Sequence, residues 1–315
     1  AVALGFAHYF VALVPEIPVK GIAVIVCLLF IALNYTGLKE SILFNDILVT
    51  VKVLILLFFI GFGLAFISPA NFTPFIPGGP GGILSGAALI FFAYTGFARV
   101  TLMAEEIKNP SQTIPRAIYL ALGISTAIYL LAGIVAIGLA GAPALADSGS
   151  PLADAIARTG SSGSVILISA GAMVATASVL LTTILGISRI VFSMARKHDL
   201  PGFLGRIHPR FGTPHYAILI TGAGMISALL LADLALVVAV STFAMLVFYL
   251  IANIAALRLP PEHRRYQKGV PVIGMLSCAG LIIFLSPASW AIGFTGLIAG
   301  GAWFFLRKRT VPDTV

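Results

Sequence analysis

The stretch "ALIFFAYTGFARVTLMAEEIKNPSQTIPRAI" (residues 88–118) begins as an apolar helix and then changes character. Tyr94, Thr95 and Gly96 lie in the middle of a segment long enough to span a membrane, and Arg99 follows within one turn. Glycine weakens a helix, and hydroxyl groups satisfy backbone groups that an interruption frees. The stretch therefore predicts an interrupted membrane helix. The alternative left open is that Gly96 is a packing position in a continuous helix, because glycine is common in membrane helices.

The composition indicates a membrane protein along the whole chain. Of its 315 residues, 59% are hydrophobic and only 10% are charged, whereas soluble domains carry about a quarter charged residues. Repeated apolar runs of about 20 residues predict membrane spans, and we count about nine full spans and one partial span. We therefore expect an all-α polytopic helical bundle. The expected spans lie near residues 1–14, 19–38, 45–67, 83–104, 115–141, 163–195, 214–232, 234–257, 270–286 and 288–306.

The positive charges divide the loops into two sets that alternate along the chain. One set is basic, and the other contains only Lys20 and Arg158 as cations. Basic loops stay on the cytoplasmic side, so we expect an integral protein of the cytoplasmic membrane with its C-terminus inside. The net charge of +8 then requires no nucleic-acid partner. The basic set comprises Lys39, Lys108, Arg116, Arg196, Lys197, Arg206, Arg210, Arg258, Arg264, Arg265, Lys268, Arg307, Lys308 and Arg309.

Titratable and nucleophilic side chains show no pattern typical of an enzyme. The five histidines share no metal-ligand spacing, and Cys27 and Cys278 lie in apolar runs without a second cysteine nearby. The glycine-rich run at residues 78–82 lacks the lysine of a nucleotide-binding loop and is expected to be an external turn. We therefore expect no metal, no cofactor and no enzymatic activity.

Three segments together resemble amino acid permeases of the amino acid–polyamine–organocation (APC) superfamily. The segment "FFAYTGFARVTLMAEEIKNPSQTIPRAI" (91–118) resembles that family's sixth transmembrane helix and the loop after it, and "NDILVTVKVLILLFFIGFG" (45–63) resembles its fifth helix. The segment "GISRIVFSMARKHDLPGFLGRIHPRFGTPHYAI" (186–218) resembles its eighth helix and the loop to its ninth. The resemblance covers essentially the whole chain. It implies a leucine-transporter-like fold of two inverted five-helix repeats, with substrate held between broken first and sixth helices.

By this resemblance the chain runs from the third to the twelfth family helix, so we expect an N-terminal truncation within a single transmembrane domain. Residues 1–67 are expected to be the remainder of the first repeat, 83–257 the second repeat, and 270–306 two additional helices. The implied function is secondary active, proton-coupled transport of amino acids or related amines by alternating access. The alternative is a non-transporting subunit that needs the missing helices or a partner chain; the substrate's side chain and any protein partner are left open.

The resemblance implies a substrate site at the interrupted helix. Phe92 matches the aromatic residue that closes over bound substrate. Ala93, Thr95 and Gly96 match the unwound segment, whose carbonyl groups accept hydrogen bonds from the substrate's ammonium group. A charged amine needs such acceptors once it leaves water. The alternative for Phe92 is packing in the core or against lipid.

Lys52 is the coupling residue that the resemblance implies. It lies in a span that is otherwise uncharged over residues 49–67, and the alternative is that its side chain snorkels to the membrane surface. Matching family members carry a lysine where sodium-coupled relatives bind sodium, so we expect Lys52 to exchange a proton. Thr182 and Thr183 are its expected hydroxyl partners. Some proton-coupled members carry an acid where this chain has Ala98, which leaves Lys52 as the candidate.

Arg99, Glu105 and Glu106 lie at the predicted cytoplasmic end of the interrupted helix. One interpretation is that they stabilise a cytoplasmic gate. The simpler alternative is a solvated anchor for the following loop, because charged residues gather at the cytoplasmic ends of membrane helices.

Overall fold

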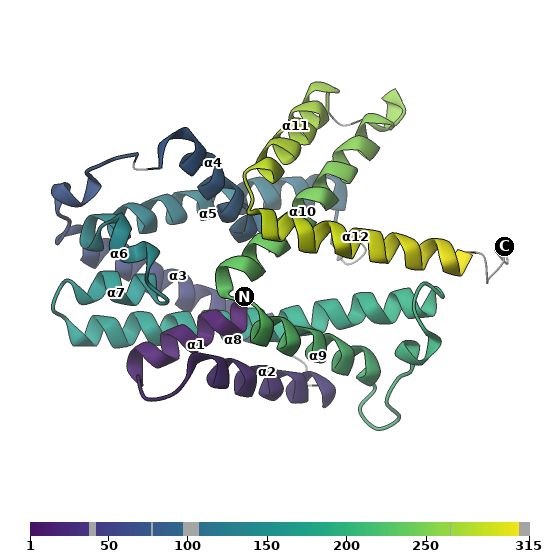
Figure 1. Cartoon of the computed structure of the whole chain (residues 1–315), viewed down its shortest axis with the longest axis horizontal. Helices are drawn as coiled ribbons and strands as arrows, with labels where there is room; N and C mark the ends of the chain where they lie inside the picture. The colour runs from purple at the N-terminus through teal and green to yellow at the C-terminus, as the bar shows by residue number, and fades with distance from the viewer. Residues whose placement is uncertain (38–41, 77, 97–106, 265, 309–315) are drawn as a thin grey trace. The chain divides into compact units, whose positions relative to one another are not determined.

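The structure of the chain is a computed structural model that describes residues 1–37, 42–76, 78–96, 107–264 and 266–308. Every regular element in these ranges is a helix (Figure 1). The α-helices are α1 (Val2–Leu13), α2 (Val19–Tyr35), α3 (Ile42–Leu64), α4 (Gly79–Ile90), α5 (Pro110–Ala140), α6 (Ala142–Ala146), α7 (Pro151–Ala157), α8 (Ser162–Arg196), α9 (His215–Leu231), α10 (Leu234–Leu257), α11 (Gly269–Ile283) and α12 (Pro287–Lys308). Short 3₁₀ helices are η1 (Pro69–Phe72), η3 (Gly202–Gly205) and η4 (Pro261–His263).

Several helices in the described ranges have the length and apolar composition of membrane spans, which confirms the predicted all-α polytopic class. Four shorter apolar helices, α1, α2, α9 and α11, have between 12 and 17 residues. The predicted number of crossings and their orientation stay predictions. Among the described residues, five helices are long and apolar enough to cross a membrane; they contain Asp46–Leu64, Pro110–Ala140, Ser162–Arg196, Leu234–Leu257 and Pro287–Leu306.

The chain forms two compact units, each assembled from segments that are distant in sequence. The first unit contains residues 1–73 and 126–234, and the second contains residues 74–125 and 235–315. The first unit thus combines residues 1–67, expected to be the remainder of the first repeat, with helices of residues 126–234, which were expected in the second repeat. The division into inverted repeats stays a prediction.

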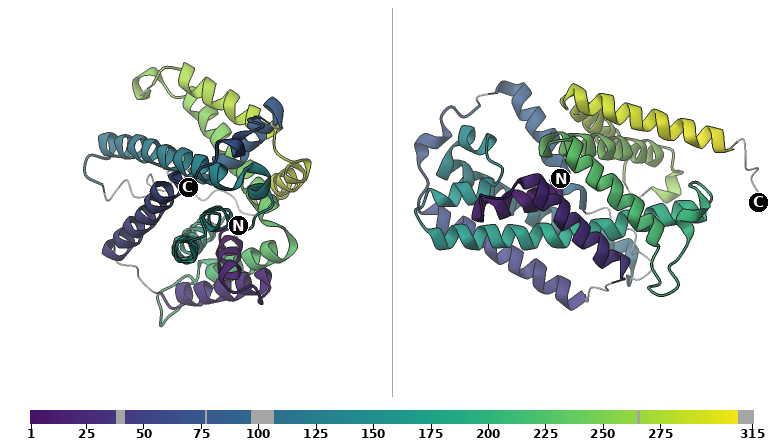
Figure 2. Two further views of the ribbon diagram at one scale, coloured as in Figure 1. Left: turned by 90° about the vertical axis from the view of Figure 1, so that its left-hand side faces the viewer. Right: turned by 60° about the horizontal axis from the view of Figure 1, so that its bottom comes forward.

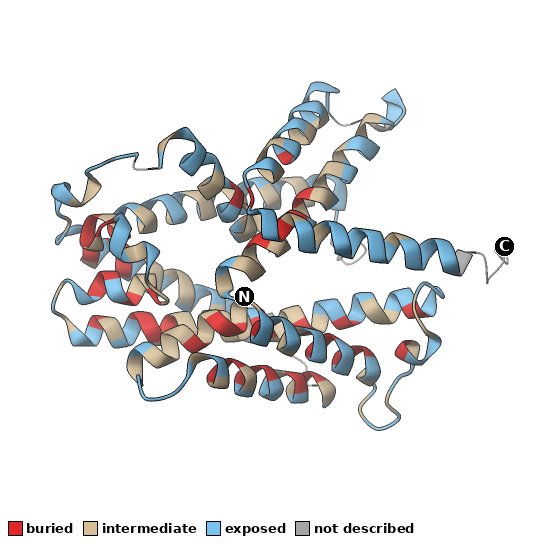
Figure 3. Ribbon diagram, viewed as in Figure 1, coloured by how far each residue is buried: buried red, intermediate tan, exposed pale blue. Residues whose placement is uncertain are grey.

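Helix α8 is the centre of the first unit. It contacts α1, α2, α3, α7 and α9, and Figure 2 shows α1 and α2 lying beside it. Leu180 and Ile184 of α8 are buried in one apolar core together with residues of α1, α2 and α9. Ile168 of the same helix is buried in a second core around Phe59 and Ile156. In Figure 3 the buried residues of α2 and α8 are interleaved with exposed ones along each helix.

The ends of α8 follow from local sequence. Ser161 is its N-cap, and the Ser161 Oγ accepts a hydrogen bond from the backbone N–H of Ser164 at 3.3 Å. A serine cap satisfies one of the N–H groups that a helix leaves free at its start. The other end stops before His198, whose φ of 62° lies in the left-handed region and cannot continue a right-handed helix.

Glycines allow the helices around α8 to approach closely. A Cβ atom on Gly171 of α8 would lie 2.7 Å from the Ile55 side chain of α3, and one on Gly222 of α9 would overlap Ile31 of α2. Membrane helices use small residues in this way, because close backbone approach increases van der Waals contact.

The second unit packs around α10. Phe243 and Leu246 of α10 form an apolar core with Ala88 of α4 and Cys278 of α11. Near this core, Gly293 of α12 packs directly against the Phe243 ring. The core holds α4, the helix that leads into the interrupted stretch, against α10 and α11.

We expect Gly171→Ala to lower the thermal unfolding temperature of the purified protein, because the added methyl group clashes with Ile55 in a packed contact. Overpacking of this kind costs about 1–3 kcal/mol. Gly186→Ala on the same helix is the matched control, since a Cβ atom there meets no described atom within 4 Å. The control should leave the unfolding temperature unchanged or raise it. Equal effects of both substitutions would contradict the proposed packing.

Candidate functional site

Lys52 of α3 contacts α8 inside the first unit. It is half-buried in the apolar segment Asp46–Leu64, and its Nζ donates a hydrogen bond to the Oγ of Ser178. An ammonium group at membrane depth requires protein partners or water. The contact with Ser178 directs the Lys52 side chain toward α8, which distinguishes it from a side chain that only snorkels to the surface.

The hydroxyl groups of Ser178 and Thr182 on α8 donate hydrogen bonds to backbone carbonyl groups of the preceding turn. The Ser178 Oγ donates to the carbonyl oxygen of Ala175 at 3.3 Å. One turn further on, the Thr182 Oγ1 lies 3.1 Å from the carbonyl oxygens of both Ser178 and Val179. Sequence reasoning named Thr182 and Thr183 but missed Ser178. The sequence contains a signal for Ser178, because it lies four residues before Thr182 and residues four apart share one face of a helix.

A cavity of about 190 Å³ adjoins Lys52 between α3 and α8. Apart from Lys52, its lining is almost entirely aliphatic and includes Ile55, Gly171 and Ala175, with Leu152 of α7 among the remaining residues. In such surroundings a charge is poorly solvated.

The α-helical conformation ends a few residues before Tyr94, Thr95 and Gly96, where the interruption was predicted. The α-helical part of α4 ends at Ile90, and residues 91–96 adopt a 3₁₀ conformation. The Thr95 Oγ1 donates to the carbonyl oxygen of Phe92 at 2.9 Å. Short 3₁₀ segments have poorer hydrogen-bond geometry and often mark functional hinges.

The surroundings of the 3₁₀ segment differ from residue to residue. The Phe91 ring packs edge-on against Tyr249 of α10, with ring centroids 5.7 Å apart. Phe92 is half-buried, and Ala93 and Gly96 are exposed. A Cβ atom on Gly96 would meet no described atom within 4 Å. Within the described ranges, packing therefore gives no reason for glycine at position 96.

The predicted site residues fall in both units. Phe92, Ala93, Thr95 and Gly96 belong to the second unit, and their role in binding stays a prediction. Lys52, Thr182 and Thr183 belong to the first unit, where the structure brings Lys52 to α8. The predicted gate residues Arg99, Glu105 and Glu106 lie outside the described residues.

These features define a helical membrane protein with a lysine contact between two spans and a helix that changes type within an apolar segment. Comparison with known proteins gives the family. The family described as "Amino acid permease" matches residues 1–305. The chain therefore belongs to this family, within the APC superfamily.

Three relatives show how far this similarity extends. An uncharacterized transporter of Mycobacterium tuberculosis is 35% identical over 91% of the chain and 66% of its own length. The methylthioribose transporter of Bacillus subtilis is 32% identical over 91% of the chain and 64% of its own length. The branched-chain amino acid permease BcaP of Bacillus subtilis is 33% identical over 88% of the chain and 61% of its own length. The chain thus spans just under two thirds of the length of these relatives.

We expect a double-mutant cycle to detect the contact between Lys52 and Ser178. Ser178→Ala should destabilise the protein, whereas the same substitution should cost little in a Lys52→Met background, because the donor is already absent. Double-mutant cycles give about 0.6 kcal/mol on average, and up to about 1.7 kcal/mol, for hydrogen bonds between membrane helices. Coupling of that size should appear in reversible unfolding by detergent. Strictly additive effects would contradict a direct interaction.

Proposed function

We propose that this protein carries amino acids or related amines across the cytoplasmic membrane by proton-coupled, alternating-access transport. Membership of the amino acid permease family supports transport in general. The observation that carries the proton coupling is the hydrogen bond from Lys52 of α3 to Ser178 of α8, beside an aliphatic cavity. The proposal includes a cytoplasmic C-terminus, which the distribution of basic loops supports.

The chemistry of the Lys52–Ser178 pair suits a proton switch. A protonated lysine only donates hydrogen bonds, whereas a neutral amine also accepts one. The Ser178 hydroxyl accepts from the ammonium group while it donates to Ala175. After loss of the proton, the same hydroxyl can rotate and donate to the Lys52 nitrogen instead. The contact between α3 and α8 thus differs between the two protonation states, as coupling requires.

The 3₁₀ segment at residues 91–96 supports recognition of an amine. Carbonyl groups at the end of a helix are acceptors for an ammonium group, and transporters use discontinuous helices for this purpose. Phe92 is the proposed lid, in keeping with its half-buried position at the start of the segment. The family relatives are named for methylthioribose, branched-chain amino acids and cationic amino acids. Methylthioribose carries no amino group, so the amine in this proposal is supported by the two amino acid transporters, and the side chain is left open.

We expect Lys52→Ala to make amino acid uptake independent of pH, because the proposed proton carrier is removed. The measurement is uptake of a panel of radiolabelled amino acids into proteoliposomes containing the full-length protein, with and without a proton gradient. Lys197→Ala, an exposed lysine beyond the end of α8, is the control and should keep the wild-type pH dependence. Sodium-dependent uptake by the wild type would contradict proton coupling.

We expect Phe92→Ala to raise the KM for uptake about tenfold, since loss of an aromatic contact costs on the order of 1–3 kcal/mol of substrate binding. Membrane insertion, measured as the yield of folded protein, should not change. Phe75→Ala is the matched control, because Phe75 is 84% exposed in the same unit. Unchanged uptake kinetics in Phe92→Ala would rule out the lid.

A further inference from the structure

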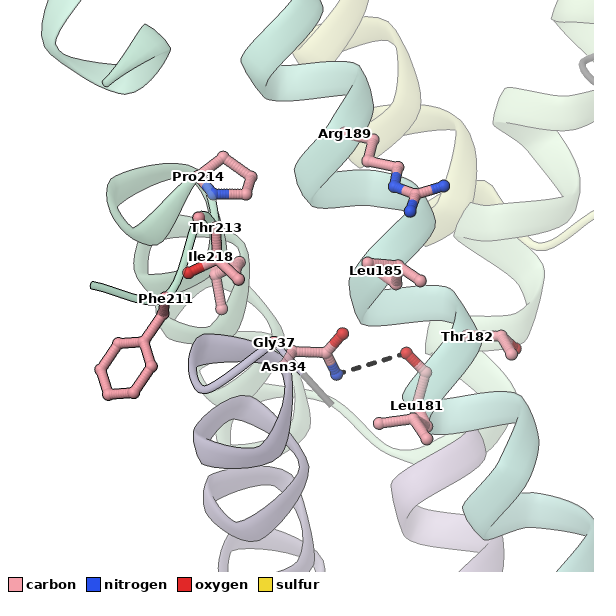
Figure 4. Close-up of a pocket in the computed structure, with 11 residues that line it drawn as sticks. Asn34, Gly37, Leu181, Thr182, Leu185, Arg189, Phe211, Thr213, Pro214 and Ile218 are labelled. Carbon is pink, nitrogen blue, oxygen red and sulfur yellow. Dashed lines mark hydrogen bonds between the residues drawn. The ribbon is translucent and has the colours of Figure 1, made fainter. Parts of the chain in front are cut away.

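A second pocket lies in the first unit, at the end of α8 where basic residues follow. It has a volume of about 470 Å³, within the range of small-molecule sites. The end of α2, the inner part of α8 and the start of α9 form its walls (Figure 4). The residues of the 3₁₀ segment do not contribute to its lining.

Asn34 of α2 presents an acceptor in this pocket. It is only 5% exposed, and its Nδ2 donates to the carbonyl oxygens of Phe30 at 2.9 Å and Leu181 at 3.4 Å. Two carbonyl acceptors fix which end of the amide is the nitrogen. The Oδ1 therefore points away from Leu181, as Figure 4 shows, and no described residue donates a hydrogen bond to it. A carbonyl oxygen that faces a pocket accepts hydrogen bonds from water or from a ligand that carries N–H groups.

Arg189 of α8 supplies the opposite chemistry to the same pocket. Its guanidinium group is exposed and lines the cavity together with Leu185 and Thr182. A guanidinium group binds carboxylate or phosphate with two parallel hydrogen bonds. A positively charged donor and an amide acceptor therefore line one pocket of small-molecule size.

The start of α9 adds to the positive side of the pocket. Thr213 and Pro214 line the cavity just before the first turn of this 17-residue helix, and no side chain caps its N-terminus. The Thr213 Oγ1 donates to the carbonyl oxygen of Tyr35 at 2.8 Å, which ties the start of α9 to the end of α2. The N-terminal end of a helix favours negative charge nearby.

We propose that this pocket binds a small zwitterion, with its carboxylate or phosphate on Arg189 and its ammonium group on the Oδ1 of Asn34. Two sources share this chemistry: a free amino acid and the headgroup of an ethanolamine lipid. The amino acid as occupant rests on the proposed function, since the pocket would then be a second substrate site on the basic side. The existence of a binding site at this pocket is inferred from its lining residues alone.

The test uses O-phosphoethanolamine as a soluble probe and the full-length protein in nanodiscs of phosphatidylcholine. Calorimetry should show binding that Arg189→Gln weakens about 10- to 100-fold, the range for loss of a charge-assisted hydrogen bond. Arg189→Lys should retain part of it. Arg196→Gln is the matched control, because Arg196 lies on the same helix over the Phe192 ring, and it should bind as the wild type does.

Competition then identifies the source of the zwitterion. Displacement of the probe by L-leucine, but not by 4-methylpentanoate or 3-methylbutylamine, would show that a free amino acid with both charges occupies the site. Binding of the probe alone would assign the site to a lipid headgroup. Absence of binding, or equal loss in Arg189→Gln and Arg196→Gln, would overturn the inference. Amino acid uptake by the wild type tests the proposed function separately, so the two failures are distinguishable.

Discussion

The contact between α3 and α8 combines two requirements that a membrane imposes. Hydrocarbon offers no water to an ammonium group, so Lys52 needs a partner from the protein, and Ser178 provides one. Hydrocarbon also offers little hydrophobic force between helices, so close packing must hold them together. Gly171 meets this second requirement by admitting the Ile55 side chain. Much of the first unit is built around α8, and its candidate coupling residue reaches that helix across this same contact.

The 3₁₀ segment after α4 shows a different use of the same solvent constraint. Backbone groups in lipid are satisfied within a helix, and departures from the α-helical pattern survive where other protein groups or a polar cavity receive them. The Thr95 hydroxyl donates back to the carbonyl oxygen of Phe92, and Phe91 is held against Tyr249. The segment is thus anchored on one side and exposed at Ala93 and Gly96.

The two polar regions of the first unit are linked by α8. Ser178 faces Lys52, Thr182 follows one turn later and lines the larger pocket, and Arg189 follows two turns after that. A single helix therefore carries hydroxyl groups at the coupling contact and a guanidinium group near its basic end. Helices with polar groups at several depths are typical of proteins that move polar solutes through a membrane.

The sequence alone predicted the helical membrane class, the approximate limits of most helices and the family. These depend on apolar run length and on glycine, whose effects are local along the chain. Three features come from helix packing: the contact of Lys52 with Ser178, the contact of Gly171 with Ile55, and the pocket that Asn34 and Arg189 line together. The physical reason is that a spacing of 3.6 residues per turn fixes which residues share a helix face. It does not fix which face of a neighbouring helix they meet; packing between helices sets that.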